Sequence, residues 1–542
     1  MKRTFRVLVV DDDEEWRSLL TEILPPGEFQ VEAVADLVEA RTALAATYFH
    51  LITLDIRLQD ADETNVQGFD LLKDLARSGQ NEATRIIVIS AFGTEEQQRE
   101  AFRDYDVMDF VNKRGADHKG FDNRSFVQRL RSAIAEKFRL NLALNVHWQG
   151  VSGPDAAVQG LRIQGSRLRA SDRDSLVFRR VALELDDLIC RLFHDAEGVL
   201  LRPLEQGHGG GGLLLAEPQY AHRGTGQRLV VKFGDFAQIH REAENYRNFV
   251  AAFIGGHRAA FLTNERRTAL LGGIAYSLIG HDSVRFRNFE EFYAESSPQA
   301  IFSLLETLFR KTCGNWYANI SSPELLNLTE DYQDLLGFTS GSLEAGLRRL
   351  PSIQGADRIK FEGLSGGLRY SNPLNLLGRQ PIVHRTCQGV SHGDLNPSNI
   401  LIDDHSNAWL IDFQATGRGH FLRDFARLDS SIRFQLLKSA TLDERRELEE
   451  SLSSPSHYAD LAVLEGSFGS ANPEIEKAFQ VSLAIRKLAT SVAVRGNHDD
   501  FREYQVASFY FALNWLRYYD TPRLEREHAF LSAAILAEKL DN

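Results

Sequence analysis

Two short stretches in which polar residues stand next to apolar runs constrain this chain more than any other feature. Residues 391–402 read Ser-His-Gly-Asp-Leu-Asn-Pro-Ser-Asn-Ile-Leu-Ile, and residues 409–413 read Trp-Leu-Ile-Asp-Phe. Asp394 is placed to accept the proton of an attacking hydroxyl group, with Asn399 shortly after it and Asp412 after an apolar strand. Mg²⁺ prefers oxygen ligands and is usually held by one or two protein groups together with substrate phosphates. The stretch therefore predicts a phosphoryl-transfer site in which Asn399 and Asp412 bind the metal.

These residues resemble the catalytic loop and metal-binding aspartate of the protein-kinase-like superfamily. The form His-Gly-Asp, in place of His-Arg-Asp, is similar to the aminoglycoside and choline phosphotransferase branch. The resemblance implies an α+β domain of two lobes, with Asp394 as the catalytic residue, Mg²⁺ as cofactor and ATP as substrate. A polar turn between two buried strands would account for any one of these residues, but less well for all of them together.

The expected small lobe covers residues 193–280. A run of glycines at 207–212 lies between two apolar segments, and a Val-Val-Lys-Phe strand follows it. Glycine lets backbone N–H groups approach a phosphate closely. The resemblance assigns Lys232 to the α- and β-phosphates and Glu242, or Glu244 in its place, to holding Lys232. It assigns the remaining nucleotide contacts to four glycines of the loop: Gly207, Gly209, Gly210 and Gly211.

The expected large lobe covers residues 281–542. The segment 417–426 resembles the part of the phosphotransferase branch in which a second aspartate, here Asp424, braces the catalytic loop. Residues 322–382 show little periodicity and are interpreted as a lid or an acceptor site, with no substrate indicated. Three helices, from 474, 503 and 522 onward, are expected to close the domain.

Short apolar strands alternate with helical segments over residues 1–140. Alternation of this kind predicts a doubly wound α/β fold with a five-stranded parallel sheet, whose functional groups lie at the carboxyl ends of the strands. The expected strand ends carry five polar residues: Asp11, Asp12, Asp55, Ser90 and Lys113. Three carboxylates in one place repel each other, and a divalent cation would relieve that repulsion.

This domain resembles the response-regulator receiver, a flavodoxin-like fold. The resemblance implies that Asp11, Asp12 and Asp55 bind Mg²⁺ and that Asp55 is the phosphoacceptor. It also implies that Ser90 and Lys113 contact the phosphoryl group and that Phe110 is the switch aromatic. The implied partners are a sensor histidine kinase or a phosphotransfer protein, together with a second copy of the chain bound through the receiver.

Composition restricts the possible partners and the compartment. The chain has 542 residues, a formal net charge of −13 and three cysteines without metal-like spacing. The acidic balance makes general nucleic-acid binding unlikely, and we expect no disulfide framework, signal peptide or membrane span. The expected location is cytoplasmic. Residues 141–192 are interpreted as a linker with a connecting helix, and the arginines of 161–180 as a solvated face.

We therefore expect a two-component (phosphorelay) response regulator whose output domain is a kinase-like phosphotransferase that uses MgATP on an unknown acceptor. Two alternatives remain open. In the first, the output domain is a nucleotide-binding pseudokinase or interaction scaffold, which the unusual glycine loop favours. In the second, the chain regulates transcription through the basic linker, although no helix-turn-helix pattern supports this. The sequence does not indicate the cognate kinase or the sign of regulation.

Overall fold

The structure is a computed structural model that describes residues 3–59, 66–91, 94–113, 121–204, 210–222, 224–254, 261–277, 286–379, 381–493, 499–518 and 521–541. The chain divides into two compact units. The first comprises Met1–Arg241 and Phe261–Leu278, and the second comprises Glu242–Ala260 and Ile279–Asn542.

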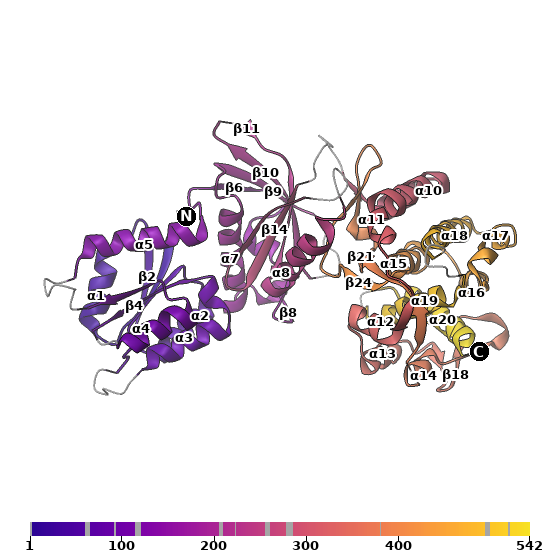
Figure 1. Cartoon of the computed structure of the whole chain (residues 1–542), viewed down its shortest axis with the longest axis horizontal. Coiled ribbons are helices and arrows are strands. Elements are labelled where there is room, and N and C mark those ends of the chain that lie inside the picture. The colour runs from indigo at the N-terminus through magenta and orange to yellow at the C-terminus, as the bar shows by residue number, and fades with distance from the viewer. Residues whose placement is uncertain are drawn as a thin grey trace. The chain divides into compact units, whose positions relative to one another are not determined.

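The first unit begins with a five-stranded parallel sheet in the order β2-β1-β3-β4-β5. Its strands are β1 Phe5–Val10, β2 Phe29–Val34, β3 Leu51–Leu54, β4 Arg85–Ser90 and β5 Asp109–Asn112. Its helices are α1 Glu14–Ile23, α2 Leu37–Ala46, α3 Gln67–Arg77, α4 Glu95–Tyr105 and α5 Asn123–Phe138. Helices α1 and α5 pack on one face, while α2, α3 and α4 pack on the other (Figure 1). The expected flavodoxin-like fold of this domain is confirmed.

Local chemistry fixes where the helices of this domain begin. The side chains of Asp13 and Asp36 accept backbone N–H groups at the first turns of α1 and α2, and Thr94 forms a capping box with Gln97 on α4. Such caps satisfy N–H groups that have no partner inside the helix. The strands β1, β3 and β4 are buried on both sides, as their continuous apolar sequences predict.

The first unit continues into a mixed sheet in the order β13-β14-β12-β10-β9-β6, with β11 paired to β10. Its strands are β6 Asn145–Trp148, β9 Gly198–Pro203, β10 Gly212–Tyr220, β11 Gly224–Thr225, β12 Leu229–Asp235, β13 Phe261–Arg267 and β14 Leu271–Ser277. A separate hairpin pairs β7 Arg162–Ile163 with β8 Ser166–Arg167. Helices α6 Pro154–Ala157 and α7 Leu176–Leu192 share the apolar core of this sheet.

The segment 141–192 differs from the predicted linker. Strand β6 pairs in parallel with β9, and α7 buries its apolar face against the sheet, where Gly273 lies close to Leu188. Five of the six arginines of 161–180 are exposed, as expected of a solvated face, whereas Arg180 is buried and bonded to Glu184 at 2.9 Å. The segment folds because its apolar residues complete the core of the sheet, whereas the sequence predicts a core formed by residues after 192 alone.

Helix α7 also anchors the receiver to this sheet through a buried polar network. Asp187 accepts hydrogen bonds from His50 at 2.7 Å and from Arg191 at 2.9 Å. The backbone N–H of Arg6 donates to Nδ1 of His50 at 2.9 Å, so Nε2 carries the proton that reaches Asp187. Burial lowers the pKa of His50 to about 4, which keeps the ring neutral. Arg191 further donates to the hydroxyl of Tyr48, in the receiver.

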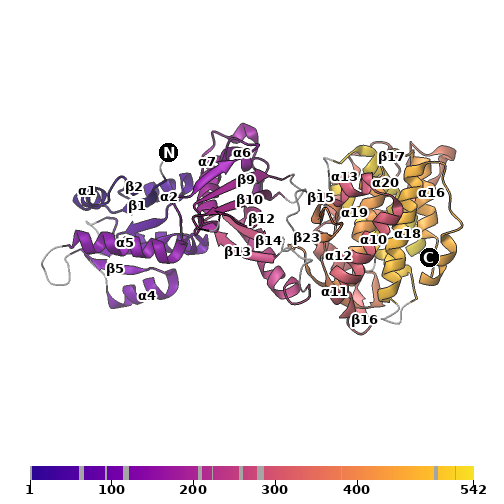
Figure 2. The same ribbon diagram turned by 90° about the horizontal axis from the view of Figure 1, so that it is seen from above.

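The second unit is mainly helical. Its helices are α9 Phe289–Glu295, α10 Pro298–Glu306, α11 Gly314–Ala318, α12 Leu328–Leu336, α13 Ser340–Leu347, α14 Pro373–Leu377, α15 Arg423–Ser431, α16 Leu442–Ser453, α17 Leu461–Leu464, α18 Pro473–Ala493, α19 Arg502–Asn514 and α20 Arg523–Leu540. Small sheets join β15 Arg287–Asn288, β22 Ile400–Ile402 and β23 Ala408–Leu410; β16 Glu324–Asn327 and β20 Val383–Thr386; β17 Ile353–Gln354, β18 Arg358–Phe361 and β19 Arg369–Ser371; and β21 Gln388–Ser391 and β24 Gly417–His420. Helix α20 contacts both α16 and α19 (Figure 2).

The described part of 322–382, residues 322–379 with 381 and 382, is folded and packed rather than irregular. Tyr332 of α12 is fully buried and stacks on Tyr510 of α19, with 5.3 Å between ring centroids. Asp331 pairs with Arg423 at 2.6 Å. The segment is therefore part of the core of this unit, and the predicted lid or acceptor role has no support from its packing. Its mixture of short strands and short helices explains why it shows no sustained periodicity.

Candidate functional site

Three carboxylates meet at the carboxyl ends of the receiver strands, as predicted. Asp11 and Asp12 follow β1, and Asp55 follows β3, so parallel pairing of these neighbouring strands brings the three together. One carboxylate oxygen of each lies within 4.8 Å of the other two. Asp11 and Asp55 are buried and Asp12 is half-buried. Three oxygen ligands in this arrangement suit a hard divalent cation such as Mg²⁺.

Lys113 counterbalances this negative charge. Its ammonium group donates to Asp55 at 2.5 Å and to Asp11 at 2.9 Å, and it lies 5.4 Å from the ring centroid of Trp16. Burial raises the pKa of Asp11 to about 6 and the charge of Asp55 adds to the rise, although Lys113 opposes it. Burial would lower the pKa of Lys113, but the charges of Asp55 and Asp11 outweigh it and raise that pKa. A proton at Asp11 therefore competes with a metal ion near neutral pH.

Of the other predicted receiver residues, Ser90 lies at the carboxyl end of its strand, and Phe110 lies two positions before that level on β5. Ser90 ends β4 and is buried, and Phe110 is a half-buried residue of β5 that packs on the core. The sequence reading missed Gly68, at the start of α3. A Cβ atom there would lie 2.4 Å from the carbonyl oxygen of Asp55, so only glycine allows α3 to approach the phosphoacceptor loop this closely.

In the second unit, Asp424 holds the loop that carries Asp394. Its carboxylate accepts the backbone N–H groups of His392 at 2.8 Å and Gly393 at 2.9 Å, and the hydroxyl of Tyr317 at 2.8 Å. Gly393 has a φ of 81°, and a Cβ atom there would lie 2.2 Å from the carbonyl oxygen of Ala415. The glycine of His-Gly-Asp is thus required by both backbone conformation and space.

The antiparallel hairpin β22–β23 brings Asn399 and Asp412 to the same end. Asn399 immediately precedes β22, and Asp412 follows β23 by two residues. The backbone N–H of Ile411 donates to the carbonyl of Asn399 at 3.1 Å, and the side-chain amide of Asn399 donates to the carbonyl of Asp394 at 2.8 Å. These bonds join Asn399 to Asp394 and to Ile411, the residue before Asp412, and the side-chain N–H bond to Asp394 leaves the amide oxygen of Asn399 as its acceptor atom.

Backbone conformation and a neighbouring helix fix the residues around Asp412. Asp412 has a φ of 68°, in the left-handed region that non-glycine residues rarely occupy. Asn245, at the end of α8 Phe236–Asn245, donates to the carbonyl groups of Phe413 at 3.2 Å and Gln414 at 2.8 Å. Strained conformations of this kind persist where the surroundings enforce them, and they cluster at functional sites.

Arg427 is a site residue that the sequence reading missed. Its guanidinium donates to Oδ1 of Asp394 at 2.8 Å, and the amide of Asn396 donates to Oδ2 at 3.0 Å. Burial would raise the pKa of Asp394, but the Arg427 charge and these hydrogen bonds outweigh it and hold the pKa below its ordinary value. Arg427 lies one helical turn after Asp424 on α15, so both side chains lie on the same side of the helix. This spacing is the sequence signal that points to Arg427.

The predicted nucleotide residues of the small lobe are described only in part. Gly207 and Gly209 lie outside the described residues. Gly211 lies beside Lys232, because a Cβ atom at Gly211 would be 3.7 Å from its Cε. Glu242 on α8 is buried, whereas Glu244 is exposed. The carbonyl of Gly210 accepts the backbone N–H of Arg162 at 2.9 Å, so the β7–β8 hairpin contacts the glycine segment directly.

The fold and the acidic cluster define the first domain as a response regulator receiver domain. A family with this description matches residues 7–122. The regulatory protein VirG of Agrobacterium fabrum is 30% identical over 128 residues, which are 24% of this chain and 45% of VirG; that of Rhizobium rhizogenes is 29% identical over 131 residues, which are 24% of this chain and 48% of VirG. The chain thus spans about half the length of these relatives. Receiver domains bind Mg²⁺ at such a cluster and typically interact with sensor kinases or phosphotransfer proteins.

The rest of the chain identifies its family. The family described as "Ternary complex associated domain 9" matches residues 196–355 and 362–517, more than half of the chain, and the chain belongs to this family.

Solved structures were similar over the receiver. A CheY-like receiver domain from Methanospirillum hungatei is 19% identical, with a TM-score of 0.21, over 25% of this chain and 97% of its own. NtrX from Brucella abortus in complex with ATP is 24% identical, with a TM-score of 0.21, over 25% of this chain and 28% of its own. Within the described residues, no helix combines the length and apolar composition needed to cross a membrane.

Proposed function

We propose that this protein is a response regulator that is phosphorylated on Asp55 and whose output domain is a kinase-like phosphotransferase using MgATP. The receiver half of the proposal rests on the buried cluster of Asp11, Asp12 and Asp55 with Lys113 between two of its members. The output half rests on the loop and hairpin that join Asp394, Asn399 and Asp412.

In the receiver, an oxygen of the Asp55 carboxylate attacks the phosphorus of a phosphohistidine on the partner kinase. The P–N bond breaks as the new P–O bond forms, and the proton needed by the histidine comes from solvent. Lys113 is already within hydrogen-bond distance of Asp55, so it can pair with the phosphoryl group there. Bound Mg²⁺ would offset the charge of the transferring group.

In the output domain, Asn399 and Asp412 would hold the metal, and Lys232 would contact the nucleotide phosphates. Of the two carboxylates assigned to holding Lys232, Glu242 is buried and Glu244 is exposed. Asp394 accepts the proton of the acceptor hydroxyl as that oxygen attacks the γ-phosphorus and ADP leaves. Catalysis of this kind depends mainly on positioning and charge stabilisation.

The brace formed by Asp424 is the observation that supports this proposal most strongly. A buried carboxylate that accepts two successive backbone N–H groups fixes the direction of the loop immediately before Asp394. The cost of burying this charge is hard to explain for a simple turn, since an apolar contact would hold a turn equally well. The burial of Asp424 is explained if Asp394 must be held at a fixed position relative to Asn399 and Asp412.

The test is incubation of the full chain with labelled MgATP and candidate hydroxyl acceptors, followed by mass spectrometry. We expect Asp412→Ala to lose metal-dependent nucleotide binding. We expect Asp394→Ala to keep binding and lose transfer, because a catalytic base need not stabilise the ground state. Asp404→Ala, at an exposed position of the β22–β23 turn, is the matched control and should behave as wild type. Absence of metal-dependent ATP binding in wild type would contradict the output half of the proposal.

A second candidate function is a nucleotide-binding scaffold without transfer. The observation that favours it is the Arg427–Asp394 pair, because a carboxylate held below its ordinary pKa is a weak proton acceptor. The same experiment separates the two functions. Metal-dependent ATP binding with no phosphorylated acceptor and no hydrolysis would establish the scaffold.

A further inference from the structure

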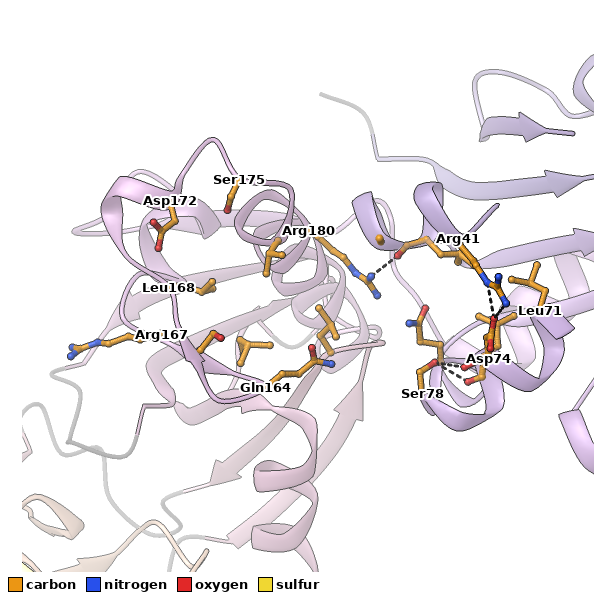
Figure 3. A pocket seen from close by; sticks show the side chains of 18 residues that line it. Arg41, Leu71, Asp74, Ser78, Gln164, Arg167, Leu168, Asp172, Ser175 and Arg180 are labelled. Carbon is orange, nitrogen blue, oxygen red and sulfur yellow. Dashed lines mark hydrogen bonds and ion pairs between the residues drawn. The ribbon is translucent and has the colours of Figure 1, made fainter. Parts of the chain in front are cut away.

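A cavity of about 710 Å³ lies within the first unit, between the receiver and the β7–β8 hairpin (Figure 3). Helices α2 and α3 of the receiver form one wall, and the hairpin with the start of α7 forms the other. Most of its surface is apolar and comes from both walls, from Leu44, Leu71 and Leu75 on one side and from Ile163 and Leu168 on the other. The cavity is open enough that Val177, which also lines it, remains about half exposed.

Arg180 of α7 lines this cavity and carries a guanidinium N–H group that has no partner among the described residues. Its Nε donates to Glu184 at 2.9 Å, and its Nη1 donates to the carbonyl of Leu44. Its Nη2 is buried and has no hydrogen-bond partner within the described part of the chain. The residue is only 6% exposed, so burial of an unmatched guanidinium N–H is costly. Figure 3 shows Arg180 extending from α7 toward α2 across the cavity.

The neighbouring charges leave the cavity suited to an anion. Arg41 is paired with Asp74 at 2.6 Å, and the carboxylate of Asp172 accepts the backbone N–H of Arg169 at 2.9 Å. These two carboxylates therefore already have partners, while Nη2 of Arg180 has none among the described residues. An acceptor oxygen that carries charge forms the stronger bond with a guanidinium.

We propose that this cavity binds a small amphipathic organic anion. Its carboxylate, sulfonate or phosphate oxygen accepts from Nη2 of Arg180, and its apolar body contacts the leucines of α2 and α3 and the hairpin. Pockets that hold small molecules generally combine an apolar lining with a few placed polar groups, as this one does. Because its two walls belong to the receiver and to the β7–β8 hairpin with the start of α7, an occupant would contact both.

The test uses 8-anilinonaphthalene-1-sulfonate as the probe, since it combines one sulfonate with an apolar aromatic body and its fluorescence rises in apolar surroundings. The full chain should bind it saturably. Arg180→Lys keeps a cation for Glu184 but removes Nη2, and we expect about tenfold weaker binding or more. Ala45→Trp places a large side chain in the cavity from an exposed position and should abolish this binding without loss of fold.

Arg131→Lys is the matched control, because Arg131 is an exposed receiver arginine paired with Glu28 far from the cavity lining. It should bind the probe as wild type does. Circular dichroism melting curves establish whether each variant is folded. If Arg180→Lys is unfolded, the comparison of Ala45→Trp with wild type tests the proposal. No saturable binding in wild type, or equal binding in wild type and a folded Ala45→Trp, would overturn the proposal.

Discussion

Asp11 carries a charge that its surroundings oppose. Burial raises its pKa to about 6, whereas in an unfolded chain the value is 3.8. Between these values the folded state holds a proton that the unfolded chain has lost, so the free energy of unfolding falls as pH rises from about 4 to about 6. At pH 7 and without metal, ionisation of Asp11 lowers the free energy of unfolding by its full amount, up to about 3 kcal/mol.

We therefore expect Asp11→Asn to stabilise the receiver at pH 7 and to flatten this pH dependence. Urea titration of the full chain, followed by hydrogen exchange in β1 and β3, measures the free energy of unfolding of the receiver at each pH. Mg²⁺ should stabilise wild type at pH 7 and have little effect on Asp11→Asn. Glu14→Gln, at an exposed first-turn position of α1, should match wild type in both respects. A steeper loss of stability with rising pH in Asp11→Asn would be incompatible with this account.

Gly393 has a conformation that a side chain cannot share. Its φ is 81°, and a Cβ atom at this position would lie 2.2 Å from the carbonyl oxygen of Ala415, so Gly393→Ala should displace the loop and weaken the bonds to Asp424. We expect a loss of about 1–3 kcal/mol in the free energy of unfolding of the second unit. Gly314→Ala is the control, since no atom would lie within 4 Å of its Cβ. Equal hydrogen exchange in residues 391–399 of both variants would show that the loop tolerates a side chain.

Arg427 helps to hold the pKa of Asp394 below its ordinary value. Replacement by methionine removes the charge that lowers the pKa, and burial then raises it. If transfer occurs, the acid limb of its pH–rate profile should move to higher pH in Arg427→Met, because Asp394 must be ionised to accept a proton. Arg418→Met, at an exposed residue of β24, should leave the profile in place. An unshifted acid limb in Arg427→Met would mean that another group limits the rate.

The residues that the sequence predicted are those whose identity follows from their chemistry. Residue type and spacing predict Asp394 as a proton acceptor and Asn399 and Asp412 as metal ligands, and the hairpin β22–β23 brings the latter two to the same end. Arg427 was not predictable in the same way, because many arginines lie near carboxylates in a sequence. Which pair forms depends on how α15 packs against the loop, and that is a property of the folded chain.

At the scale of elements, α7 is held to the receiver by a charged network rather than by apolar contact alone. Removal of Asp187 would leave the buried guanidinium of Arg191 without its carboxylate. We expect Asp187→Ala to cost about 3–5 kcal/mol at this junction. Hydrogen exchange in α7 and at the start of β3 should rise in this variant. Asp174→Ala, which breaks only an exposed pair with Arg179, should change neither, and equal protection in both variants would refute the role of the network.

The sequence held a signal for this element that the linker interpretation passed over. Arg180 and Glu184, and likewise Asp187 and Arg191, are four residues apart and therefore adjacent on a helix. Counted as net charge, the arginines suggested a solvated face. Arg180 and Arg191, each paired with a carboxylate at helical spacing, indicate a helix that buries charges in matched pairs. What the sequence could not give is the receiver side of the network, because His50 and Tyr48 are more than a hundred residues away.

For the whole molecule, β3 connects the phosphoacceptor to the junction with α7. His50 precedes this strand and bonds to Asp187, whereas Asp55 follows it. Charge added at Asp55 would draw in Lys113 and Ser90 and rearrange the loops after β4 and β5 around Phe110, which alters the face formed by β4, α4 and β5. We therefore expect phosphorylation to change both the junction and the output domain. The same face is the one through which we expect a second copy of the chain to bind.

The measurement compares the full chain with and without beryllofluoride and Mg²⁺, a mimic of the phosphoryl group on Asp55. A coupling of about 1–3 kcal/mol would change ATP affinity or turnover roughly 5–150-fold. Hydrogen exchange across His50 and α7 should change in wild type, and sedimentation velocity reports any dimer. Asp55→Asn is the control and should show none of these responses. If wild type shows none either, the receiver does not control the domain to which it is joined, and its signal must pass to a separate partner through the exposed surface of α4.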